Sequence, residues 1–230
     1  MTRTTNARIA GFTFLLYIAA GLTSMALFRR ATSGEGTAAK LAGIAEHATE
    51  VGFLVLLGLV QCFSAIVLAV TLYAITREQD KDLAMLGLTC RVGEGIIAGL
   101  SIPGMLTLLW LATSTGTNAP ATDAAHALAA YLLRSDVAFT ATFFAVGSTL
   151  FSYLLLRGQM IPIPLAWLGV GASVLLVICL PLQLAGFIDG LITTLMWLPM
   201  LVFEVPLALW LLAKGVATPT PDANVMIRSA

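Results

Sequence analysis

Residues 51–76 read VGFLVLLGLVQCFSAIVLAVTLYAIT, and this stretch decides the fold class because it contains no charged residue. An α-helix rises ~1.5 Å per residue, so roughly 20 apolar residues cross the ~30 Å hydrocarbon core of a membrane. A helix also satisfies all of its own backbone hydrogen bonds, which hydrocarbon demands. The stretch therefore predicts a membrane-spanning helix.

Five further apolar runs of similar length accompany this one. The predicted spans are about 9–28, 51–76, 83–113, 137–156, 164–185 and 191–213. The chain is 59% hydrophobic and 10% charged, whereas a soluble domain is about a quarter charged. Its mean hydropathy is +0.95. We predict an all-α, polytopic six-transmembrane-helix bundle, with residues 1–216 as one membrane domain and 217–230 as a polar, disordered cytoplasmic tail.

The distribution of Lys and Arg predicts the orientation, because cytoplasmic connections are enriched in these residues. With the N-terminus inside, the inner side holds Arg3, Arg8, Arg77, Lys81, Arg157, Lys214 and Arg228. The outer side holds Arg29, Arg30, Lys40 and Arg134, so the excess favours N-in and C-in. The adjacent Arg29 and Arg30 argue the other way. We expect a multi-pass protein of the plasma (inner) membrane, whose first run is long enough to be a retained span instead of a signal core.

Several function classes are disfavoured by composition. Twelve basic and twelve acidic residues leave no net charge, so no basic surface for nucleic acid is expected. The three cysteines form no CxxC pair, which argues against a zinc site or a disulfide framework. His47 and His126 lie in polar connections without carboxylates at supporting spacings. No cofactor, metal or catalytic residue is therefore assigned.

Residues 90–99, CRVGEGIIAG, introduce charge into the third span through Arg91 and Glu94, and the sixth span carries Glu204. From the helix rise, all three lie roughly 13–18 Å from the inner surface. Intramembrane charges face the bundle interior, and an unpaired one costs several kcal/mol. We therefore predict that Arg91 pairs with Glu204, Glu94 or both. The small residues on the same helical face are Gly87, Gly95 and Ala98.

The composition of this buried charged cluster has a consequence for function. One arginine and two glutamates leave one excess negative charge, which a proton, a bound cation or a cationic ligand must offset. Three further polar residues in or near the spans could contribute to the same site. Gln61 lies at nearly the depth of the cluster, Gln183 lies nearer the outer surface, and Asp136 lies at the outer boundary.

Two outer connections contain helix-forming residues. Residues 37–50 follow a candidate cap at Thr37, and residues 122–134 begin at a candidate cap, Thr122 or Asp123. Residues 37–50 predict that the second span begins as a longer helix above the membrane, and residues 122–134 predict a short helix. These segments are expected to be lids over a site or ordinary connectors at the membrane surface.

Four stretches together suggest a family. They are RIAGFTFLLYIAAG (8–21), TCRVGEGIIAG (89–99), TFFAVGSTLFSYLLLRGQMIPIPLAWLGV (142–170) and FEVPLALWLLAKGV (203–216). Over about residues 8–216 the chain resembles the bacterial integral-membrane proteins grouped as the domain of unknown function 4386 family. The resemblance implies six membrane helices and carries no catalytic signature.

Three functions compete at this point. The first is binding or translocation of a small, lipophilic or cationic ligand through a bundle that contains Arg91, Glu94 and Glu204. The alternative is a non-catalytic structural or accessory membrane protein, in which the cluster only locks helices together. An intramembrane enzyme comes third, because the chain has no HExxH, GxSxG or P-loop motif. Membrane lipids and a small-molecule ligand are the expected partners.

Overall fold

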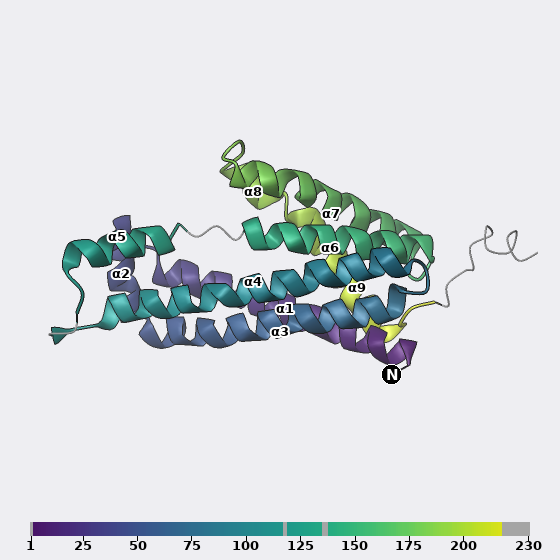
Figure 1. The fold of residues 1–230 in the computed structure, drawn as a ribbon, viewed down its shortest axis with the longest axis horizontal. Coiled ribbons are helices and arrows are strands. Elements are labelled where there is room, and N and C mark those ends of the chain that lie inside the picture. The colour runs from purple at the N-terminus through teal and green to yellow at the C-terminus, as the bar shows by residue number, and fades with distance from the viewer. Residues whose placement is uncertain (1, 117–118, 135–137, 218–230) are drawn as a thin grey trace, which may run out of the picture. The chain divides into compact units, whose positions relative to one another are not determined.

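A computed structural model describes residues 2–116, 119–134 and 138–217, and within these ranges the chain is helical without a strand (Figure 1). Among the described residues, six segments are long and apolar enough to cross a membrane, which confirms the six-span, all-α prediction. They are α1 (Arg3–Ala31), α3 (Ala48–Thr76), α4 (Lys81–Thr113), α6 (Ala138–Arg157), α7 (Ile163–Leu184) and the segment Leu191–Ala213. The protein is therefore a multi-pass membrane protein, whose N-in, C-in orientation stays a prediction.

The spans bury small residues together with large apolar ones, and they also expose many large apolar side chains. Ala10, Ala69 and Ala208 are fully buried, whereas Leu100 is 71% and Phe63 63% exposed. Small residues let membrane helices approach closely, and exposed apolar surface of this extent requires a nonaqueous environment. The pattern fits lipid around the spans.

The sixth span differs from its prediction as one continuous helix over 191–213. It consists of α8 (Leu191–Leu195) and α9 (Leu198–Ala213), separated at Met196 and Trp197. Pro199 is the second residue of α9. Because proline has no backbone N–H and its ring clashes with the preceding turn, it suits the start of a helix better than its middle.

The short helix expected over 122–134 is present as α5 (Thr122–Leu132). The second span does not begin as a longer helix, because residues 36–46 form the separate helix α2 (Gly36–Glu46), whose C-cap is His47, before α3 begins. The expected caps of α2 and α5 are wrong. The N-cap residues are Glu35 and Ala121, and neither makes a side-chain capping hydrogen bond. The positive φ of Gly36, +79°, shows that α2 begins from a backbone turn instead of a side-chain cap.

The chain forms two compact units. Unit 1 comprises residues 1–15, 65–94 and 138–230, and unit 2 comprises residues 16–64 and 95–137, so that α1, α3 and α4 each contribute to both. This division does not test the prediction that residues 1–216 form one membrane domain, which therefore stays a prediction. Of the predicted tail, 217–230, only residue 217 lies within the described part of the chain.

Unit 1 contains α6, α7 and α9, and α6 lies alongside α7 in Figure 1. Glycines permit the close helix contacts in this unit. A Cβ atom on Gly11 would lie 2.6 Å from the carbonyl oxygen of Ala208, so α1 meets the backbone of α9 directly. Gly169 of α7 likewise lies against the ring of Phe203.

Unit 2 is organised around the two short helices, and α2 packs on α5 (Figure 1). Its apolar core consists of Ala31, Leu41, Ile44, Val51, Leu54, Leu108, Leu111, Ala125 and Ala129. Gly43 permits close approach to the carbonyl oxygen of Ala31. An ion pair joins Arg30 to Glu50 over 3.4 Å.

Candidate functional site

Arg91 of α4 is 1% exposed and is the largest fully buried side chain among the described residues. Its Nη1 atom lies 2.9 Å from Oε2 of Glu94, one helical turn further along. Glu94 is also 1% exposed. The sequence left Glu204, Glu94 or both open as partners of Arg91, and the structure contains the ion pair with Glu94, within α4.

The aliphatic stem and guanidinium of Arg91 are held by α6. A Cβ atom on Gly147 would lie 2.8 Å from Cγ of Arg91 and 3.0 Å from Cδ, so only glycine leaves room for this arginine. The guanidinium carbon lies 4.9 Å from the ring centroid of Phe144. A cation over an aromatic face is attracted by the ring quadrupole, more strongly where water is excluded. The arginine is thus fixed by a carboxylate and by an aromatic ring.

Glu204 of α9 is the second carboxylate of the cluster and is 6% exposed. Its Oε1 atom is buried and accepts no hydrogen bond from the described residues. Glu204 lines a cavity together with Ser148, which follows Gly147 in α6, and Gly147 lies against the stem of Arg91. The three charged groups therefore belong to one neighbourhood of unit 1. The ion pair at 2.9 Å joins Arg91 to Glu94, so Glu204 is the carboxylate of the cluster that stands outside this ion pair.

A small cavity lies beside Glu204. Its volume is about 10 Å³, which is room for about one water molecule. Ser148 and Ser152 of α6 contribute hydroxyl groups to the lining. The apolar part of the lining comes from Phe14, Leu72, Phe151, Leu155, Phe203 and Leu207. A carboxylate and two hydroxyls in an apolar shell can coordinate one water molecule or one small cation.

The secondary polar residues do not join this arrangement in unit 1. Gln61 belongs to unit 2, where its Nε2 donates a hydrogen bond to Oγ of Ser24 over 3.3 Å. Gln183 is half-buried in the last turn of α7. Gly169 of α7 packs against Phe203, the residue that precedes Glu204 in α9. Gln183 lies ~20 Å further along α7 than Gly169, so it is far from Glu204. Asp136 lies outside the described residues.

The contribution of α6 to the site was not among the features predicted from the sequence. Gly147, Ser148 and Ser152 are buried small residues, and the two serines are spaced by four and so share one helical face. Small residues at this spacing are typical of membrane-helix contacts, and this signal could have identified the face. Without coordinates, nothing in the pattern says that the face opposes Arg91.

The described residues bring together no group of three His, Cys, Asp or Glu side chains that could hold a metal ion by themselves. The spans and the cluster define the class as a multi-pass helical membrane protein with a buried ion pair and an additional buried carboxylate. The chain belongs to the DUF4386 family, described as a domain of unknown function, whose sequence profile matches residues 9–215. No curated protein and no solved structure matches the chain.

Proposed function

We propose that the protein binds a small cation at Glu204, inside unit 1. The observation that carries the proposal is the division of charge within the cluster. Arg91 is bonded to Glu94 at 2.9 Å, while the buried Oε1 of Glu204 accepts no hydrogen bond from the described residues. A second anion in an apolar interior costs several kcal/mol, and a bound cation removes that cost.

The size of the cavity restricts the class of ligand. About 10 Å³ accommodates a proton with its water molecule or a monovalent metal ion that Glu204, Ser148 and Ser152 coordinate. A larger cation, such as an organic amine, would require the aromatic rings of Phe151 and Phe203 to move. Passage of the ion across the membrane would require the same rings to open a path.

The test is thermal unfolding of the purified protein in detergent, with two arms. In the first, pH is varied at constant sodium concentration. In the second, Na⁺ replaces N-methylglucamine at constant pH and ionic strength. The wild-type Tm should respond in one arm, and E204Q should respond in neither. A ligand at ten times its Kd stabilises the folded state by about 1.4 kcal/mol, which is a Tm shift of a few degrees.

A matched control separates this effect from general electrostatics. E78Q removes a carboxylate that is 63% exposed in the turn after α3, and this variant should keep the wild-type response. A response to pH alone identifies the cation as a proton, and a response to Na⁺ identifies it as a metal ion. Equal responses of the wild type and E204Q, or none in either arm, would refute the proposal.

A second candidate is the structural lock, which is favoured by the fit of Arg91 against Gly147 and Phe144. In this function the cluster fixes α4 against α6 and binds nothing. Breaking one member of a buried pair is destabilising, whereas replacing both with apolar residues can be neutral. The lock therefore predicts that R91L/E94L is more stable than R91L and that the wild type is insensitive to small cations.

A further inference from the structure

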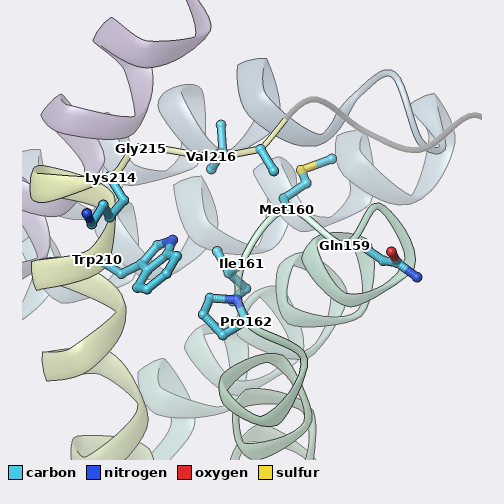
Figure 2. A pocket seen from close by; sticks show the side chains of 9 residues that line it. Gln159, Met160, Ile161, Pro162, Trp210, Lys214, Gly215 and Val216 are labelled. Carbon is cyan, nitrogen blue, oxygen red and sulfur yellow. The ribbon is translucent and has the colours of Figure 1, made fainter.

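An open cavity of about 440 Å³ lies in unit 1 beyond the last turn of α9 (Figure 2). Its lining residues do not include any member of the charged cluster. They are Gln159, Met160, Ile161, Pro162, Trp210, Lys214, Gly215, Val216 and Ala217. Its volume is within the usual range of ligand pockets, ~300–1,000 Å³.

Backbone hydrogen bonds fix the walls of this cavity. One wall is the turn between α6 and α7, closed by a bond from the N–H of Met160 to the carbonyl of Leu155. Gln159 occupies the left-handed position of this turn, with φ 49°. The chain after α9 turns at Gly215, with φ 73°, and the N–H of Ala217 donates to the carbonyl of Met160 over 3.0 Å. The cavity is thus part of the folded framework.

The lining combines one cation with an aromatic donor and an apolar floor. Lys214 and Trp210 come from the end of α9, and Lys214 is exposed to solvent. In Figure 2 the indole of Trp210 lies between the α9 backbone and Ile161, and the Gln159 amide points away from it. Among the described residues, no carboxylate lines the cavity. These groups suit a ligand with a negative charge, a hydrogen-bond acceptor and an apolar part.

The surrounding end of unit 1 is positively charged. Arg3 donates from Nη2 to the carbonyl of Ile75 over 2.7 Å and lies 3.8 Å from Sδ of Met160, which lines the cavity. Among the described residues, the first two turns of α1, the connection from α3 into α4 and the ends of α6 and α9 carry six basic side chains against three acidic ones. They are Arg3, Arg8, Arg77, Lys81, Arg157 and Lys214, against Glu78, Asp80 and Asp82. The excess charge favours an anionic ligand.

We propose that this cavity binds the headgroup of an anionic phospholipid. The ammonium of Lys214 pairs with the lipid phosphate, and the indole N–H of Trp210 donates to a phosphate or glycerol ester oxygen. Ile161 and Pro162 contact the first carbons of an acyl chain. A lipid is the occupant because α9 is part of a span and Trp and Lys at a span end lie at headgroup level.

The experiment is native mass spectrometry of the full chain from nanodiscs with equal phosphatidylglycerol and phosphatidylcholine. The wild type should retain phosphatidylglycerol in preference. One Lys near an anionic surface contributes about a fivefold change in binding, so K214Q should retain about fivefold less phosphatidylglycerol. The matched control is K81Q, an exposed lysine at the same end that does not line the cavity. It should retain phosphatidylglycerol nearly as the wild type does, with an unchanged Tm in both variants.

Three results would overturn the proposal. Equal losses in K214Q and K81Q would mean that general positive charge attracts the lipid. Displacement of phosphatidylglycerol by millimolar inorganic phosphate would mean that the site takes free anions. A chain ending at Ala217 that binds markedly more phosphatidylglycerol would mean that residues 218–230 are the native occupant.

W210F tests the hydrogen bond assigned to Trp210, because this variant keeps an aromatic ring and removes the N–H. It should retain less phosphatidylglycerol without loss of Tm, and full retention would contradict the assigned hydrogen bond.

Discussion

Gly147 of α6 lies against the aliphatic stem of Arg91, so close that a Cβ atom would come within 2.8 Å of Cγ. The arginine cannot retreat, because it is 1% exposed and its guanidinium is held by Glu94 and Phe144. The pair explains how a bulky cation fits between two membrane helices. Helix α4 contributes the charged side chain, and α6 has a glycine at the point of contact.

The first prediction follows from this contact. G147A should destabilise the protein by about 1–3 kcal/mol, because the new methyl group overpacks the core. Thermal unfolding in detergent measures the loss. The control is G171A in α7, where an added Cβ meets nothing within 4 Å, and alanine there should be neutral or slightly stabilising. Equal effects of the two substitutions would contradict the contact.

A second close approach joins α1 to α9. On Gly11 a Cβ atom would lie 2.6 Å from the carbonyl oxygen of Ala208 and 2.8 Å from the backbone nitrogen of Leu212. Backbone atoms cannot rotate away, so G11A should separate the helices and cost at least ~1–3 kcal/mol. G52A in α3 is the control, since nothing lies within 4 Å of the added atom. Wild-type stability of G11A would show that the helices do not approach in this way.

The ion pair gives a third prediction. R91L leaves Glu94 buried without its partner and should destabilise by about 3–5 kcal/mol. R91L/E94L removes both charges and should recover much of this loss. The partly exposed pair Arg30 and Glu50, 3.4 Å apart, provides the comparison, and R30L should cost no more than ~1 kcal/mol. Additive losses in R91L/E94L would argue against a buried pair.

The cavity beside Glu204 gives a fourth prediction. S152A keeps the shape of the lining and removes one hydroxyl group that is 2% exposed. Loss of one hydrogen bond to a bound cation or its water should weaken the cation response about fivefold to tenfold, measured as the apparent Kd from thermal shifts. S101A, on an exposed face of α4, should leave the response unchanged. An unaltered Kd in S152A would remove Ser152 from the site.

Hydropathy predicted the spans because the free energy of transferring a segment from water to lipid depends on its amino-acid composition. The uncharged run 51–76 lies within α3, Ala48–Thr76, and the third span ends at Thr113 as predicted. The interruption of the sixth span depends on how Pro199 is accommodated, and the apolar run 191–213 contains no signal strong enough to locate it.

The charged residues of the site were also predictable, because charge in a membrane span is costly wherever it occurs. Arg91, Glu94 and Glu204 are all buried. Two features required coordinates. The choice of Glu94 as the ion-pair partner depends on side-chain rotamers, and the role of Gly147 depends on which face of α6 meets α4. Helix periodicity shows which residues share one face of a helix, but it does not show which neighbouring helix that face contacts.

Infrared difference spectroscopy of the Glu204 carboxyl group tests the proposed cation site most directly. The carboxylate and carboxylic acid stretching bands are recorded for the wild type and E204Q while pH or Na⁺ concentration is changed. We predict a band that is present only in the wild type and that changes with pH, for a proton, or with Na⁺, for a metal ion. Identical difference spectra for the wild type and E204Q under both changes would contradict cation binding at Glu204.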